Sequence, residues 1–138
     1  MKDRLAHVVR EAARALTRDL TARLAAHSVS FGHWAFLRIL WENDGLTQRE
    51  LSERAGVMEP TTAAALKAME ELGYVERRQL PENRKNVYVH LTPKGRALRA
   101  RLEPLAVAVN KAAVRNVAAG DVAACRRTLL ALLENLKP

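Results

Sequence analysis

The stretch LTQRELSERAG, residues 46–56, contains the signals for a short helix with well-defined ends. Thr47 and Glu50 have the spacing of a capping box, in which the hydroxyl accepts a hydrogen bond from the amide of Glu50 while the carboxylate reaches back to the amide of Thr47. We therefore expect the helix to begin after Thr47. It should end at Gly56, because glycine readily adopts the left-handed conformation that ends a helix.

The next stretch, VMEPTTAAALKAMEELG at residues 57–73, predicts a second helix directly after that turn. This helix begins at Pro60, whose missing amide costs nothing in a first turn, and it ends at Gly73. Two short helices joined by a glycine turn are typical of a helix-turn-helix. The spacing places on the buried face Thr62, Ala65, Leu66, Met69 and Leu72. It places on the outward face Thr61, Ala63, Ala64, Lys67 and Ala68.

Beyond Gly73 the hydrophobic period changes to two, which is the period of a β-strand. Strands are predicted for YVERRQ (74–79) and VYVHL (87–91), joined by the turn LPENRKN (80–86). This pattern predicts a β-hairpin with a charged tip that holds Arg84 and Lys85. One face of the second strand is apolar and consists of Val87, Val89 and Leu91.

Long helical patterns flank this central part. Apolar residues recur every three or four positions from Leu5 to Leu24, and a second helix is expected to begin after Ser30 and to end at residues 43–45. Downstream, Thr92 and Pro93 predict another long helix, which Pro104 should bend or shift. Gly120 and Asp121 are expected to end that helix and to cap the last one. Its apolar stripe consists of Val122, Cys125, Leu129, Leu132, Leu133 and Leu136.

The charge of the chain is unevenly distributed. The 138 residues carry a net charge of +8, and residues 76–101 hold eight basic and two acidic side chains. A basic segment of this length indicates a polyanionic partner, with nucleic acid as the first candidate and an anionic membrane surface as the second. No apolar run approaches the roughly 20 residues that cross a bilayer, so we expect a cytoplasmic protein.

In this central part the sequence closely resembles the MarR family of bacterial transcriptional regulators. The resemblance runs from about Trp34 to Leu98 and rests on GLTQRELSERAGV, MEELGYVERR and NRKNVYVHLTPKGRAL, which match the family pattern of LTQxELA, LExxGLV and DxRxxxVxLTxxG in order and spacing. The resemblance implies a mainly α fold with a small β-hairpin wing, in which a winged helix-turn-helix is flanked by dimerisation helices. The expected organisation is one continuous domain with an N-terminal dimerisation helix (1–29), a DNA-binding region (30–98) and C-terminal dimerisation helices (99–138).

The resemblance also implies how double-stranded DNA would be bound. The second helix of the motif would enter the major groove and Arg84 of the wing the minor groove, with two protomers on a pseudo-palindromic operator. The sequence departs from the family at Ala64 and Ala68, where relatives often have arginine, and at Lys67 and Asn83, where they have aspartate. These departures lead us to expect less direct base readout by the helix and a larger contribution of the wing to DNA binding. The predicted DNA contacts are Gln48, Arg49, Thr61, Thr62, Ala64, Lys67, Arg77, Arg78, Arg84 and Lys85.

Many relatives release DNA when a small aromatic or phenolic acid binds, which makes such an effector a hypothesis for this chain. The candidate ligand residues are Arg14, Arg18, His27, His33 and Trp34, each of which has the alternative role of core or surface residue. Cys125 lies on an apolar stripe, so we expect a buried structural thiol rather than an oxidant sensor. The sequence shows no metal-ligand spacing, and no metal or cofactor is expected.

Two other classes of function are an enzyme and a protein-interaction module. No P-loop, dinucleotide-binding turn, nucleophile elbow or metalloprotease motif is present, so an enzyme is not expected. A winged helix that only binds other proteins is the stronger alternative, because a fold does not dictate a function. The sequence thus predicts a homodimeric transcriptional regulator that acts as a repressor, as the resemblance implies, with a protein-interaction module or a regulator without ligand as alternatives.

Overall fold

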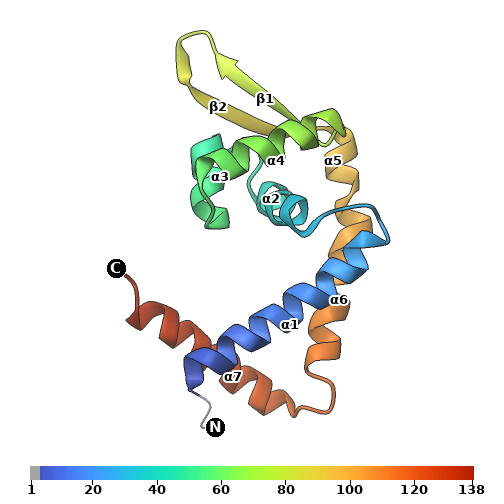
Figure 1. Cartoon of the computed structure of the whole chain (residues 1–138), viewed down its shortest axis with the longest axis vertical. Coiled ribbons are helices and arrows are strands. Elements are labelled where there is room, and N and C mark those ends of the chain that lie inside the picture. The colour runs from blue at the N-terminus through green and yellow to red at the C-terminus, as the bar shows by residue number, and fades with distance from the viewer. Residues whose placement is uncertain (1–3) are drawn as a thin grey trace.

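The computed structural model describes residues 4–138, and at Arg84 it describes the backbone alone. A lobe with the hairpin at its far end stands on the long terminal helices (Figure 1). The elements in chain order are α1 (Leu5–Ala25), α2 (Phe31–Glu42), α3 (Gln48–Ala55), α4 (Glu59–Glu71), β1 (Val75–Leu80), β2 (Asn83–Leu91), α5 (Pro93–Ala97), α6 (Arg99–Ala113) and α7 (Ala119–Asn135). The predicted winged helix-turn-helix with flanking helices is therefore confirmed.

The core of the lobe lies where α2, α3, α4 and the base of the hairpin meet. Its fully buried side chains include Leu37, Leu40, Leu51, Leu66, Met69 and Val89. Trp34 and Trp41, one beside the other on α2, pack edge to face with ring centroids 5.7 Å apart. The indole N–H of Trp41 donates to the carbonyl of Gly95 at 3.0 Å, which joins α2 to α5.

The helix ends near the centre of the chain lie close to where the sequence places them. Ser30 caps α2 by accepting a hydrogen bond from the amide of His33 at 3.1 Å. Both bonds of the capping box between Thr47 and Glu50 are present, at 3.0 and 3.1 Å. Gly56 ends α3 in the left-handed conformation with φ +70°.

Leu72 is the exception on α4, because its side chain is 43% exposed and not buried as predicted. It occupies the C-cap position of the helix, and its dihedral angles are still helical, at φ −77° and ψ −10°. The buried residues of α4 are Thr62, Leu66 and Met69.

The hairpin differs from the prediction in the length of its turn. Pro81 and Glu82 alone connect the strands, because pairing extends to Leu80 and Asn83 across a register shift after Arg78. Arg84 and Lys85 therefore belong to β2.

The C-terminal helices also divide at other points than predicted. The helix expected after Thr92 is present as α5 and α6, which meet at Leu98 with helical dihedral angles and i→i−4 hydrogen bonds on both sides, and Pro104 lies within α6. A break separates α6 from α7 at residues 114–118, where Asn116 has φ +64°. Gly120 and Asp121 lie in the first turn of α7, so the prediction that they end one helix and cap the next is wrong.

The terminal helices leave much apolar surface uncovered. On α1 only Leu20 and Leu24 are buried, and in the described chain α7 buries none of its residues. Cys125 of α7 is exposed, which contradicts the expected buried thiol for the single chain. Apolar side chains exposed on these elements include Leu5, Val8, Leu16, Val107, Leu129, Leu130, Leu133 and Leu136. Over residues 4–138, no helix has both the length and the apolar character needed to span a membrane.

The crossing of α5 and the start of the hairpin depends on Gly95. A Cβ at this buried position would lie 2.1 Å from the carbonyl oxygen of Tyr74, which is backbone and cannot move aside. We expect Gly95→Ala to lower the free energy of unfolding by about 3 kcal/mol, the upper range for overpacking a core. Denaturant titration followed by circular dichroism measures the change.

Gly120→Ala is the matched control, because a Cβ there would meet no atom within 4 Å and the residue lies inside α7. Alanine in a helix is more favourable than glycine by about 0.5–1 kcal/mol, so this variant should be slightly more stable than the wild type. Equal stability of the two alanine variants would contradict the proposed close contact at Gly95.

Candidate nucleic-acid interface

Helix α4 has one buried and one exposed face. At intervals of three residues, Met58, Thr61, Ala64 and Lys67 form an exposed ridge that begins at the N-cap of the helix. Lys67 is the one charged side chain in this ridge. The ridge is therefore narrow enough to approach a nucleic-acid groove closely, and it offers methyl and hydroxyl groups in place of long polar side chains.

Thr62 faces the opposite way and is fully buried. Its hydroxyl lies 2.7 Å from that of Ser52, and this pair of polar groups joins α4 to α3 inside the core. Because its side chain has no exposed surface, Thr62 cannot contact DNA in this conformation. The prediction that Thr62 contacts DNA is therefore wrong, and the residue has a structural role.

The hairpin is anchored to the lobe through β2. The amide of Val89 donates to the carbonyl of Leu46 at 2.8 Å, and the amide of Gly45 donates to the carbonyl of Val89 at 3.0 Å. The amide of Leu91 donates to the carboxylate of Asp44 at 2.8 Å. The link between α2 and α3 thus holds the base of the wing beside the helix-turn-helix.

Three predicted basic contacts are engaged in ion pairs within the chain. Arg77 pairs with Glu70 at 2.7 Å, Arg78 with Glu76 at 2.7 Å, and Arg49 with Glu53 at 3.4 Å. The pairs of Arg49 and Arg78 are exposed, so solvent weakens them and the arginines can exchange to another anion. The pair of Arg77 with Glu70 is half-buried, so Arg77 exchanges less readily to another anion.

A polar recess of about 450 Å³ lies between the wing and the two helices of the motif. It is lined by Thr47, Gln48, Arg49, Glu59, Lys85, Asn86 and Val87. Lys85 forms no ion pair with any described residue, and Arg49 is exposed at its rim. The start of α3, the start of α4 and strand β2 therefore surround one site with cationic and hydrogen-bonding groups, which suits a phosphate.

Arg84 lies two residues after the turn on β2, and its side chain is outside the described part of the structure. Its predicted entry into the minor groove stays a prediction.

The structure adds residues that the sequence interpretation omitted. Asn86 and Glu59 line the polar recess, and Met58 stands at the exposed end of the α4 ridge with 75% of its side chain accessible. Met58 occupies an N-cap without a side-chain cap bond, at a position that usually holds Ser, Thr, Asp or Asn. In the sequence, the lack of Ser, Thr, Asp or Asn directly before Pro60 could have indicated that Met58 is exposed at the start of the helix.

The predicted ligand residues do not come together in one cavity. Trp34 lines a recess of about 230 Å³ between α1, α2 and α6, whereas Arg14 and Arg18 line a neighbouring recess along α1. Thr17 borders both recesses. His27 and His33 line neither, and burial lowers the pKa of His33, which favours its neutral form.

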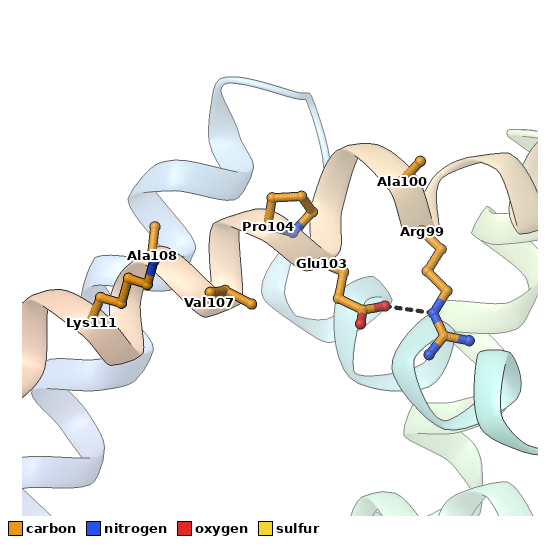
Figure 2. Close-up of a pocket in the computed structure, with 7 residues that line it drawn as sticks. All are labelled: Arg99, Ala100, Glu103, Pro104, Val107, Ala108 and Lys111. Atoms are coloured by element: carbon orange, nitrogen blue, oxygen red, sulfur yellow. Dashed lines mark hydrogen bonds and ion pairs between the residues drawn. The ribbon is translucent and has the colours of Figure 1, made fainter. Parts of the chain in front are cut away.

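A larger groove of about 590 Å³ runs along the outer side of α6 (Figure 2). Its apolar floor contains Pro104 and Val107, and Arg99 and Lys111 stand at its two ends. Arg99 is held by Glu103 at 2.5 Å and by Glu42 at 2.8 Å. The hydrogen bond to Glu103, together with the nearby carboxylate charges, raises the pKa of Arg99. Across the described residues, no group of three or more potential ligands is placed to hold a metal ion.

Known proteins resemble this chain in sequence and in fold. A sequence model described as the MarR family matches residues 29–87. The homoprotocatechuate degradative operon repressor of Escherichia coli is 31% identical over 94 residues, which cover 68% of this chain and 62% of that protein. The first curated relatives are matched over 54% to 69% of their own length.

Solved structures match over nearly the whole chain. The transcriptional regulator PA3341 is 31% identical, with a TM-score of 0.85 over 97% of this chain and 98% of its own. The MarR family protein Rv2887 of Mycobacterium tuberculosis, in complex with salicylic acid, is 24% identical, with a TM-score of 0.76 over 95% of this chain and 97% of its own. The latter similarity extends to the fold alone.

The capping box predicts a pH dependence of stability. The hydrogen bond from the amide of Thr47 lowers the pKa of Glu50, and the Thr47 hydroxyl and the charge of Arg54 lower it further. Because the folded pKa lies below the unfolded value of about 4.3, the ionised carboxylate stabilises the fold above that pH. This contribution is lost as the pH falls through the folded pKa.

We expect Glu50→Gln, which keeps a cap but cannot ionise, to show a flatter loss of unfolding free energy between about pH 5 and pH 3 than the wild type. Urea titration at several pH values measures the slope. Glu53→Gln on the same helix is the control for the removal of one carboxylate. If both variants follow the wild-type curve, the capping box does not contribute to acid sensitivity.

Proposed function

Because the chain belongs to the MarR family of transcriptional regulators, we propose that it binds double-stranded DNA as a homodimer and represses transcription from the bound site. The observation that carries this proposal is the recess shared by α3, α4 and β2, in which Arg49 and Lys85 outnumber the single carboxylate of Glu59 beside the exposed ridge of α4. In this arrangement α4 enters the major groove while the wing follows the backbone into the adjacent minor groove.

The roles of the side chains follow from their exposure and charge. Thr61, Ala64 and Lys67 face the base edges, with Lys67 able to reach guanine or phosphate. Gln48, Arg49, Arg78 and Lys85 neutralise or bind phosphates, and Arg84 reads the width of the minor groove. The departures from the family at Ala64 and Ala68 leave this surface with less hydrogen-bonding capacity, so the wing contributes more of the affinity.

Dimerisation is supported by the uncovered apolar side chains of α1, α6 and α7. A monomer rarely leaves so many leucines and valines exposed to water, and a second copy related by a twofold axis would cover them. The same axis would present two α4 helices to half-sites roughly one helical turn apart. Sedimentation should therefore give twice the 15.4 kDa of the chain.

A duplex selected by the protein from a randomised DNA library provides the test of DNA binding. We expect Arg84→Ala to weaken binding about tenfold, because a charged groove contact contributes about 1–3 kcal/mol. The logarithm of the affinity should fall linearly with the logarithm of salt concentration, by about 0.9 for each phosphate neutralised. Fluorescence anisotropy between 50 and 300 mM salt measures both.

Arg115→Ala serves as the charge-matched control, because this residue lies in the link between α6 and α7, at the end of the molecule away from the wing (Figure 1). Equal affinities of the two variants would remove the wing from the mechanism. Affinity that does not depend on salt would favour the alternative of a protein-interaction module.

We extend the proposal to an effector, a small aromatic acid that relieves repression. The solved salicylic acid complex of a protein with this fold motivates the choice of class. In this chain the recess beside Trp34 has apolar walls from Leu16, Phe31 and Val109 and an exposed amide at Asn110. Arg14 and Arg18 lie beyond Thr17 in the adjoining recess, where their charge attracts a carboxylate.

Salicylate should raise the melting temperature of the wild type and weaken its binding to the selected duplex. Asn110→Asp places a negative charge at the recess and should reduce both responses, because like charges repel the ligand carboxylate. Asn135→Asp at the end of α7 adds the same charge elsewhere and is the control. A melting temperature that no benzoate-like acid changes would leave a regulator without such an effector.

A further inference from the structure

We propose that Arg77 is a positioning residue, which together with Glu70 and Gln48 fixes the wing against the helix-turn-helix and does not itself contact phosphate. The inference rests on the proposed function, because its consequence is measured as DNA binding. It changes the role of one residue that the charge pattern alone assigns to the DNA backbone.

The carboxylate of Glu70 holds both the main chain and the side chain of Arg77. Its Oε2 accepts a hydrogen bond from the Arg77 backbone amide at 3.2 Å, and its Oε1 accepts one from Arg77 Nε at 2.7 Å. Glu70 belongs to α4 and Arg77 to β1. Strand β1 therefore cannot slide or rotate relative to α4 without breaking one of these two bonds.

The third member of the junction is Gln48 at the start of α3. Its side-chain oxygen accepts a hydrogen bond from Arg77 Nη1 at 3.5 Å, so one guanidinium connects α3, α4 and β1. The side chains of Arg77 and Glu70 are 26% and 34% exposed, which is the lowest exposure of any ion pair formed within the described chain. An arginine that is half-buried and already paired with a carboxylate interacts only weakly with a phosphate.

The junction complements the anchoring of the other strand. Backbone hydrogen bonds to Leu46 and Gly45 hold β2 at Val89, and Val89 is the register partner of Arg77 on β1. The wing is thus attached on one side by main-chain bonds and on the other by the Glu70 carboxylate. Loss of the carboxylate bonds would leave β1 held to α4 only at its start, where the amide of Tyr74 donates to the carbonyl of Met69 at 2.9 Å, so the strand beyond that point could move relative to α4.

A fixed angle matters because α4 and the wing would occupy two adjacent grooves at the same time. If the wing is correctly placed in only a fraction of molecules, the apparent affinity falls by that fraction. The junction therefore contributes to binding without touching DNA, through the population of the competent arrangement.

Glu70→Gln tests the inference because two mechanisms predict opposite changes in the affinity for DNA. Removing a negative charge near a DNA-binding surface tightens binding if charge alone matters. The amide, however, replaces one acceptor oxygen with a donor, so one of the two bonds to Arg77 is lost in either orientation. We expect the affinity for the selected duplex to fall about tenfold, the effect of a wing that is correctly placed one-tenth of the time.

Glu71→Gln is the matched control, because it removes the same charge from the next residue of the same helix, which is exposed and outside the junction. This variant should bind as tightly as the wild type or more tightly. Tighter binding by Glu70→Gln would overturn the inference.

Arg77→Gln separates positioning from phosphate contact. Positioning predicts a similar loss of affinity with an unchanged dependence on salt, whereas a lost phosphate contact would reduce the slope by about 0.9 for each protomer. Footprinting at saturating protein supplies a second readout. Both variants should protect both grooves as the wild type does, because the bound state has the wing in place. A lost contact between Arg77 and phosphate would instead expose the sugars beside that phosphate in Arg77→Gln.

Lost protection under the wing at saturating protein, or a reduced salt slope for Arg77→Gln, would overturn the inference, while salt-dependent binding by the wild type would keep the proposed function intact. Failure of the wild type to bind any selected duplex would overturn both, and is recognised before any variant is compared.

Discussion

The arrangement depends on the requirement that α4 bury one face and expose the other. Leu66 and Met69 fill the centre of the lobe, and the hydroxyl pair of Thr62 and Ser52 satisfies the polar groups that this burial would otherwise strand. Because its buried face fixes the position of α4, the exposed ridge of this helix can consist of side chains that do not hold it in place. The rest of the lobe, including the anchoring of the wing, is organised around that helix.

The charges of the lobe divide into those that build it and those that remain available to a ligand. Glu70 with Arg77 fastens two elements together, and the Thr47–Glu50 box fixes the start of α3. Lys67 and Lys85 form no ion pair with described residues and lie on the surfaces where an anion would arrive. The net charge of the basic segment therefore overstates the number of cations that are free for DNA.

Much of this architecture could be predicted from local chemistry. Ser30, Thr47 and Gly56 act through hydrogen bonds and backbone preferences within a few residues, so their sequence context suffices. The burial of Thr62 was also predicted from the period of α4, although the same residue was assigned to DNA. Arg77 was predicted as a DNA contact, and its bonds to Glu70 and Gln48 could not be predicted because both partners lie on other elements. The exposure of Cys125 depends on where α7 packs, which helical periodicity does not determine.

The two-residue turn at Pro81 and Glu82 sets a rule for how such a wing can change in length. Near the tip of β2 a register shift interrupts the alternation of faces, and the consecutive residues Lys85, Asn86 and Val87 all line the polar recess. Closer to the base, where Arg77 pairs with Val89, a single insertion would exchange the two faces of a strand. An insertion of two residues in each strand would preserve every facing and carry the tip about 7 Å further out. The regular base of the hairpin can therefore lengthen only in paired steps, whereas the irregular segment near its tip accommodates single residues.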